Sequence, residues 1–144
     1  RKQYEENERY NLTTIDNAPT VTGLIFFRPT RGMLSSTFDA NQKHFGIDIA
    51  ASPNESVLAT LDGTVILATY TADTGYVIQV QHSQNLVSVY KHCGSLLKRV
   101  GDTVKAGEAI ALVGNTGEKT TGPHLHFEIW NRGRALDPSK YIVF

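Results

Sequence analysis

From about Asn17 onwards, short apolar runs are separated at close intervals by Gly, Asn and Asp. In several of these runs hydrophobic and polar residues alternate, and a period of two is typical of a β-strand that buries one face. The clearest expected strands cover residues 64–70, 76–82, 86–92, 109–113 and 124–130. No amphipathic helical period of useful length follows residue 17. We therefore expect an all-β fold, a small and mainly antiparallel domain of two sheets packed or folded over each other like a β-sandwich.

Turn-forming residues indicate how these strands are connected. The tetrapeptide HSQN, residues 82–85, is expected to close a hairpin between strands 76–82 and 86–92. The pair Asp62-Gly63 supplies a turn before strand 64–70. The segment VGDTVKAGEAIALVG, residues 100–114, is expected to make a tight return held by Gly101 and Gly107.

A chain of 144 residues suffices for one domain with its own core. Residues 1–9, RKQYEENER, are highly charged and lack Gly and Pro, which fits the end of a solvated helix or coiled coil and fits a disordered tail equally well. We therefore expect residues 1–20 to be a linker, or the helical or extended end of a longer protein, and residues 21–144 to be the folded domain. The chain begins at Arg1 without a methionine or a signal-like segment, so we expect it to be a fragment of that longer protein.

The charge balance excludes one class of partner. Lys plus Arg and Asp plus Glu each number 14, and no block of like charge follows the first nine residues, so a nucleic-acid partner is not expected. The single Cys93 excludes an intramolecular disulfide framework and leaves the redox compartment open. It is expected to be a small apolar filler, because thiolate zinc sites usually contain clustered cysteines.

The chain has five histidines, and the strand 124–130 holds two of them. Side chains two residues apart point to the same face of a strand, so His124 and His126 share a face, which Glu128 continues. The opposite face is expected to belong to the core, with Leu125, Phe127 and Ile129. Two imidazoles on one side of a strand favour a polar site, and two exposed histidines without a role are the alternative for this stretch alone.

A second stretch, KHFGIDIA, places His44 and Asp48 four residues apart, and on a strand they too face one way. Together with one imidazole of the 124–126 pair they would provide three ligands of types that Zn²⁺ accepts. Three protein ligands leave a position for water, as in catalytic zinc sites. The spacing leaves open which of His124 and His126 would bind the metal.

The other histidines and Glu128 have separate expectations. His92 ends strand 86–92 on the face of Tyr90, where a catalytic group and a solvated strand end fit equally well. His82 is expected to be a structural hydrogen-bonding residue. Glu128 faces the histidines and either orients one of them from outside the ligand set or is simply solvated.

Four motifs, HFGIDIA, VYKHCGSL, VGDTVKAGEAIALVGNTG and TGPHLHFEI, resemble in order and spacing those of the LytM/lysostaphin-type zinc metallopeptidases, the M23 peptidase family. The resemblance runs from about Arg28 to Pro138. It implies a small, largely antiparallel β-domain with one Zn²⁺ ion at the base of a groove bounded by loops. It also implies the metal ligands His44, Asp48 and His126 and the catalytic histidines His92 and His124.

The family hydrolyses peptide bonds in bacterial peptidoglycan, so the resemblance implies a zinc metalloendopeptidase that acts on stem-peptide cross-links or on cross-bridges. It further implies an extracytoplasmic location, in the periplasm or cell envelope, with membrane attachment only through an anchor upstream of this segment. A regulatory partner protein is also expected. The alternative is a catalytically silent module that retains the scaffold and binds the cell wall or activates an amidase.

Three positions depart from the family pattern: Asp39 replaces a usual glycine, Asn41 a usual arginine, and Cys93 a common leucine.

The segment VGDTVKAGEAIALVGNTG also resembles the hairpin of biotinyl and lipoyl carrier domains. A carrier presents a lysine at a hairpin tip, and the candidate turn Asp62-Gly63 contains none. The carrier interpretation also explains none of the histidines, so a carrier is not expected.

Overall fold

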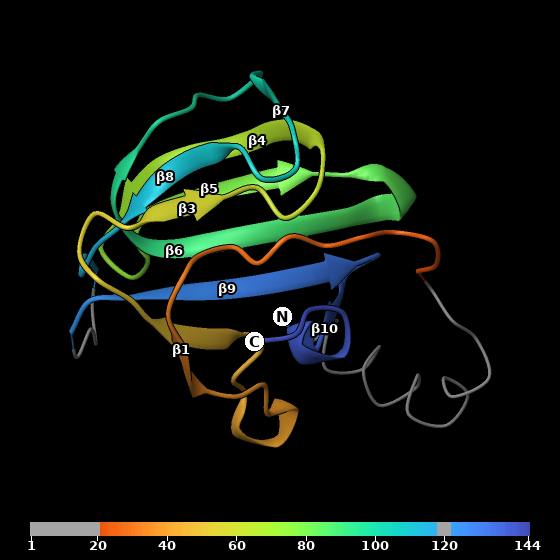
Figure 1. The fold of residues 1–144 in the computed structure, drawn as a ribbon, viewed down its shortest axis with the longest axis horizontal. Coiled ribbons are helices and arrows are strands. Elements are labelled where there is room, and N and C mark those ends of the chain that lie inside the picture. The colour runs from red at the N-terminus through yellow and green to blue at the C-terminus, as the bar shows by residue number, and fades with distance from the viewer. Residues whose placement is uncertain (1–20, 118–121) are drawn as a thin grey trace.

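Ten β-strands and three short 3₁₀ helices make up the regular structure of residues 21–117 and 122–144, which are the residues that the computed structural model describes. Figure 1 shows the chain as a curved sheet with β9 running beside β6. In chain order the elements are β1 (Met33–Ser36), η2 (Ala40–Gln42), β2 (Ile47–Ala50), β3 (Ser56–Leu58), β4 (Gly63–Thr71), β5 (Gly75–Gln81), η3 (Ser83–Asn85), β6 (Leu86–Leu96), β7 (Thr103–Val104), β8 (Ala109–Val113), β9 (His124–Asn131), β10 (Arg134–Leu136) and η4 (Pro138–Lys140).

The five strands expected from the sequence are confirmed as β4, β5, β6, β8 and β9. Four of them agree with the expected bounds to within one residue at each end, whereas β6 continues past His92 to Leu96. The hairpin at HSQN is also confirmed, because η3 joins β5 to β6 there. The expected return around Gly101 and Gly107 has another form: β7 pairs with β4, whereas β8 pairs with β3 and β6.

The strands form one antiparallel network with the order β1-β2-β9-β6-β5-β4-β7. Strand β6 changes partner along one of its edges. Its residues 86–91 pair with β9, and its residues 93–96 pair with β8. The sheet therefore forks at His92, and within the described residues an isolated bridge joins Gly114, just after β8, to His124 at the start of β9.

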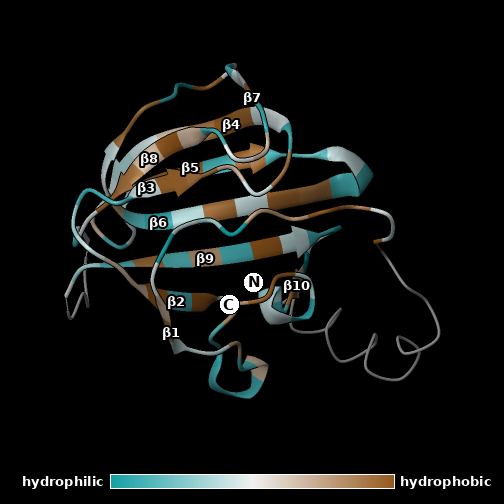
Figure 2. Ribbon diagram, viewed as in Figure 1, coloured by the Kyte–Doolittle hydropathy of each residue, from teal (hydrophilic) through white to brown (hydrophobic). Residues whose placement is uncertain are grey.

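The core fills the space between the sheet and the ribbon of β3 and β8, which lies in front of β4 and β5 in Figure 1. Ile110 of β8 and Ile78 of β5 belong to the same buried cluster, which makes the two layers one core. The inner face of β9 is at most 1% exposed at its three expected core residues, Leu125, Phe127 and Ile129. Figure 2 shows the resulting alternation of hydrophobic and hydrophilic bands along β9.

The fold is all-β and antiparallel, as expected, and its strands form one unclosed sheet network. Among residues 21–117 and 122–144, no helix is long and apolar enough to cross a membrane. The linker or helical end expected for residues 1–20 lies outside the described residues.

Candidate metal centre

The three residues that the resemblance implies as metal ligands converge on one point. Asp48 on β2 and His126 on β9 are Cα partners in the antiparallel pair, so their side chains rise from the same face. Asp48 Oδ2 lies 3.2 Å from His44 Nε2, and Asp48 Oδ1 lies 2.7 Å from His126 Nδ1. One ligand atom from each residue lies within 4.8 Å of the other two. The cluster has the dimensions needed to surround one metal ion.

His44 reaches this point from a turn, and its expected place on a strand is wrong. It precedes β2 and forms an isolated bridge with Asp39. The Asp39 carboxylate caps η2, and Lys43 follows with a left-handed φ of 58°, which turns the chain back. His44 Nδ1 lies 2.7 Å from the Thr37 carbonyl and must donate to it, so the Nε2 atom is left to face Asp48.

Gly46 lets this turn lie directly against β9. A Cβ atom at this position would lie 2.5 Å from the Phe127 carbonyl oxygen and 3.0 Å from His126 Nε2. The first distance is shorter than any real Cβ contact, and its partner is backbone, which cannot swing aside. The absence of a side chain at Gly46 therefore allows His44 and His126 to share one site.

The two histidines expected to be catalytic lie next to each other. The ring centroids of His92 and His124 are 5.1 Å apart, and those of His92 and His126 are 6.3 Å apart. His92 Nδ1 donates to the Thr116 carbonyl at 2.7 Å, and His124 Nδ1 donates to the Gly122 carbonyl at 2.8 Å. In a neutral ring with its single proton on Nδ1, the Nε2 atom is the acceptor.

The backbone places His92 differently from the expected alternation. Its φ of 64° is left-handed, and the register of β5 against β6 shifts between Tyr76 and Ile78, which is the geometry of a β-bulge. Tyr90 lies in the core with 0% exposure, whereas the ring of His92 turns out toward His124. The expectation that His92 shares the face of Tyr90 is therefore wrong, because the bulge reverses the alternation at the fork of the sheet.

Glu128 is buried and contacts the cluster. Its side chain is 9% exposed, and Oε2 lies 2.7 Å from His126 Nε2 and 3.0 Å from Lys91 Nζ. The indole Nε1 of Trp130 donates to Oε1 at 2.8 Å. Burial alone would raise the pKa of Glu128, but the hydrogen bond from His126 and the charge of Lys91 lower it to about 2. The carboxylate is ionised at neutral pH, and the interpretation of Glu128 as merely solvated is wrong.

Lys91 and Trp130 were not singled out from the sequence. Trp130 continues the row of same-face residues that begins at His124, so its position was readable from the period of two. Lys91 lies on another strand, and only the cross-strand register places it opposite His126.

The cluster shifts the pKa values of its members. Although burial opposes the change, hydrogen bonds to Asp48 and Glu128 raise the pKa of His126 to about 8. Burial would raise the pKa of Asp48, but the hydrogen bond and charge of His126 hold it below its usual range. Burial lowers the pKa of His92. At neutral pH, Asp48 is therefore ionised and His92 neutral, and a metal ion that bound His126 would displace a proton.

Two residues outside the site behave as expected. His82 is 7% exposed, its Nδ1 donates to the Asp62 carbonyl at 2.7 Å, and its Nε2 hydrogen-bonds the Ser88 hydroxyl at 2.7 Å. Cys93 is fully buried in the hydrophobic core. His82 is a structural residue and Cys93 an apolar filler, as the sequence predicted.

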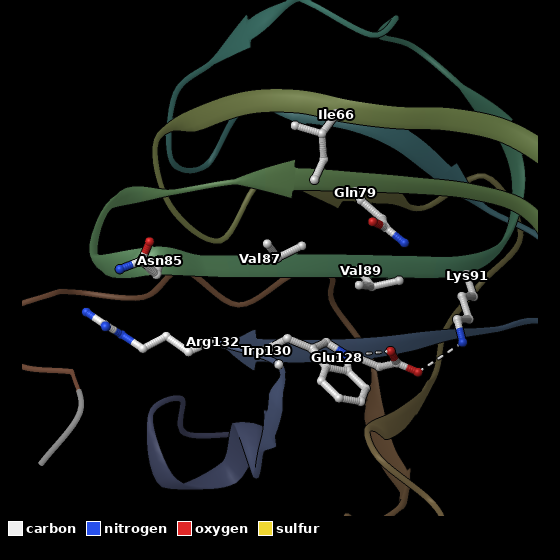
Figure 3. Close-up of a pocket in the computed structure, with 10 residues that line it drawn as sticks. Ile66, Gln79, Asn85, Val87, Val89, Lys91, Glu128, Trp130 and Arg132 are labelled. Carbon is white, nitrogen blue, oxygen red and sulfur yellow. Dashed lines mark hydrogen bonds and ion pairs between the residues drawn. The ribbon is translucent and has the colours of Figure 1, made fainter. Parts of the chain in front are cut away.

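Two hollows lie in the surface near the cluster, and His124 lines one of them. One of about 420 Å³ lies beside Asp48 and His124 and is bounded across from them by Ser35 and Ser36 of β1. The other, of about 350 Å³, is drawn in Figure 3. It lies on the outer face of β4, β5, β6 and β9 and has Lys91, Glu128 and Trp130 among its lining residues.

An antiparallel β-domain thus carries a His/Asp/His cluster of a size that suits one metal ion, beside two further histidines. The model of peptidase family M23 matches residues 42–138, and the chain belongs to this family. The family expected from the motifs is thereby confirmed.

Individual proteins extend this comparison. The murein hydrolase activator NlpD of Escherichia coli is 39% identical over 117 residues, which are 79% of this chain and 30% of NlpD. A putative peptidase M23 from Pseudomonas aeruginosa has a similar structure, with a TM-score of 0.76 and 29% identity over 97% of this chain and 61% of that one. A zinc-containing peptidase from Vibrio cholerae has a TM-score of 0.63 and 32% identity over 78% of this chain and 36% of that one. The chain spans only 24% to 37% of the length of the curated relatives that it matches first.

Proposed function

We propose that this domain is a zinc-dependent endopeptidase that hydrolyses peptide cross-links or cross-bridges in bacterial peptidoglycan. The observation that carries the proposal is the complete set of side chains at one point. Three potential ligand atoms lie within 4.8 Å of one another, and two more histidines, each held at Nδ1 by a backbone carbonyl, lie beside them. A site that only bound a metal for stability would be closed by a fourth protein ligand.

The donors present fit zinc. Two imidazoles and one carboxylate are a known catalytic ligand set for Zn²⁺, and the three side chains remain 13% to 25% exposed, so an ion and a water molecule have access. His44 would bind through Nε2, His126 through Nδ1, and Asp48 through its carboxylate. A bound Zn²⁺ ion supplies a Lewis acid that lowers the pKa of a coordinated water to roughly 7 and polarises a carbonyl group.

The protein's own contribution to the reaction comes from His92 and His124. A neutral Nε2 accepts the proton of the attacking water, and a protonated Nε2 donates a hydrogen bond to the oxyanion that develops on the scissile carbonyl. The Thr116 and Gly122 carbonyls fix both rings through Nδ1, so neither ring has to reorient during the reaction. Proton transfer by such groups contributes about 10²- to 10⁴-fold in rate.

The substrate class is supported by the relatives. NlpD is named a murein hydrolase activator, and a structural relative with a TM-score of 0.68 is the antimicrobial peptidase lysostaphin. Peptidoglycan lies outside the cytoplasm, so the proposal includes an extracytoplasmic location in the periplasm or cell envelope. The hollow lined by Asp48 and His124 would accommodate the peptide next to the cut bond.

A second candidate is a silent module that activates a separate murein hydrolase, because several relatives are named activators. The filled ligand set favours the enzyme. Metal analysis of the purified domain, followed by mass spectrometry of peptidoglycan incubated with it, tests the choice. A peptidase produces new amino and carboxyl termini within the peptides, and a chelator prevents their formation. A zinc-loaded domain that binds peptidoglycan and releases products only with an added hydrolase contradicts the proposal and supports the activator.

A further inference from the structure

His126 differs from the other three histidines of the site in the way its ring is held. His44, His92 and His124 each donate Nδ1–H to a backbone carbonyl, at 2.7, 2.7 and 2.8 Å respectively, and keep Nε2 for the site. The ring of His126 is reversed: Nδ1 faces Asp48, and Nε2 lies 2.7 Å from the Glu128 carboxylate. Among these four rings, His126 is the one in which the nitrogen that points away from the site is hydrogen-bonded to a side chain instead of a backbone carbonyl.

From this reversal we infer that Glu128 is a positioning residue for the metal ligand His126. Its carboxylate accepts the Nε2–H bond, which fixes the proton on Nε2 and leaves the Nδ1 lone pair for the metal. An anionic acceptor on Nε2–H also makes the Nδ1 lone pair a more basic metal ligand than a backbone carbonyl would. The inference rests on the proposed zinc site, and it assigns Glu128 a role in metal affinity and no direct contact with substrate.

The carboxylate of Glu128 is itself fixed from both sides. Lys91 Nζ contacts Oε2 and Trp130 Nε1 donates to Oε1, as the dashed lines in Figure 3 show. Lys91 lies directly opposite His126 in the β6–β9 pairing, so the cation and the imidazole approach the same oxygen from neighbouring strands. With a donor on each oxygen, the carboxylate has little freedom to turn away from His126.

The turn that contains Gly46 covers the contact between Glu128 and His126. A Cβ atom on Gly46 would lie 2.8 Å from Glu128 Cγ and 3.0 Å from His126 Nε2, so the turn before β2 packs against this pair. A charged hydrogen bond shielded from water is stronger than an exposed one. The packing therefore favours a defined role over a solvated surface contact.

The experiment compares Glu128→Ala and Glu128→Gln with the wild type. A matched control is Glu108→Gln. Glu108 also forms an ion pair with a lysine, with its Oε2 atom 2.6 Å from Lys98 Nζ, but it lies just before β8 and outside the histidine cluster. Zinc affinity is measured by competition with a chromogenic chelator, and the protonation pattern of His126 by ¹⁵N chemical shifts of the imidazole in the zinc-loaded protein. Thermal unfolding in chelator reports on stability alone.

We expect Glu128→Ala to weaken zinc binding by about 10- to 100-fold, the range for the loss of such a partner. Glu128→Gln should lose less, because an amide oxygen still accepts from Nε2–H. Glu108→Gln should bind zinc as the wild type does. The Nε2 shift of His126 should move in both Glu128 variants, which a purely structural role would not require.

Wild-type zinc affinity in both Glu128 variants overturns the inference, and so does a loss of affinity with unchanged His126 shifts. If Glu128→Ala does not fold, the comparison of Glu128→Gln with Glu108→Gln decides alone. The proposed function fails separately: a wild-type domain that binds zinc and cuts no peptide contradicts the peptidase, whereas unchanged affinity in active Glu128 variants contradicts only the positioning role.

Discussion

His124 and His126 lie on the same face of β9 and use opposite ring nitrogens. His124 is held at Nδ1 by the Gly122 carbonyl, 2.8 Å away, which leaves Nε2 available. His126 turns Nδ1 toward Asp48 at 2.7 Å, and its Nε2 contacts Glu128. Two identical side chains on one strand are therefore held differently, which matches the roles proposed for them, His124 as an acid or base and His126 as a zinc ligand.

This asymmetry predicts that the two alanine variants differ in kind. His126→Ala removes one of the three proposed zinc ligands, so we expect it to lose the metal and with it all cleavage. His124→Ala should keep a stoichiometric zinc ion and lose about 10²- to 10⁴-fold in cleavage rate, because only proton transfer and oxyanion stabilisation are removed. Metal content by inductively coupled plasma mass spectrometry and initial rates on peptidoglycan fragments check both.

His82→Gln serves as the control for these variants, since His82 lies outside the site and hydrogen-bonds the Asp62 carbonyl and Ser88. It should retain metal and activity. Loss of zinc from His124→Ala, with full zinc in His126→Ala, would reverse the assignment of the two residues.

The sequence predicted the strands well where they are long and have one buried face. Along β9 the apolar core residues alternate with the row that His124 begins, although Glu128 in that row is itself buried, so the period of two identified both faces of the strand. The short strands were not predicted. β3 has three residues and β7 has two, which is too few for a pattern, and their pairing depends on distant partners.

The candidate site was predictable in its residue types and less so in its geometry. The spacing of His44 and Asp48 indicated a metal site, and only the family resemblance chose His126 over His124. The turn that carries His44 and the bulge that carries His92 both depend on left-handed residues, Lys43 and His92 itself. Such conformations are uncommon outside glycine and have no signature in hydrophobic patterning, so they became visible only in the structure.

The backbone conformation at His92 leads to a prediction about the stability of variants at this position. A left-handed φ of 64° is strained for a residue with a Cβ atom and relaxed for glycine. We expect His92→Gly to be more stable than His92→Ala by about 1 kcal/mol in urea unfolding, although both lose the imidazole and should be equally poor in cleavage. Equal stability of the two variants would show that the bulge relaxes once the histidine is gone.

Gly46→Ala should disturb both the fold and the metal site. The added Cβ atom would meet the Phe127 carbonyl oxygen at 2.5 Å, and neither strand β9 nor the turn can yield without moving His44 or His126. We expect a loss of about 1–3 kcal/mol in stability, as for other overpacked positions, together with weaker zinc binding.

Gly101→Ala provides the comparison for Gly46→Ala. Gly101 has a left-handed φ of 95° and no atom within 4 Å of a Cβ position, so its substitution introduces backbone strain without a clash. It should lower stability and leave zinc affinity unchanged. If Gly46→Ala also binds zinc normally, the close contact at Gly46 does not control the ligand geometry.

Acid should destabilise the domain partly through His82. Burial lowers its pKa, while the hydrogen bond to the Asp62 carbonyl and the Asp62 charge act in the opposite direction; Ser88 faces the other nitrogen. Above about pH 6.5, the ordinary histidine pKa, both the folded and the unfolded chain carry a neutral ring, and His82 contributes no pH dependence. As the pH falls below that value, the unfolded chain binds the proton first, so the free energy of unfolding decreases.

In chelator, the loss of stability between pH 8 and pH 5 should therefore be smaller in His82→Gln than in the wild type, measured by urea unfolding at each pH. An identical loss in both proteins would show that the His82 ring is protonated as easily in the folded domain as in the unfolded chain.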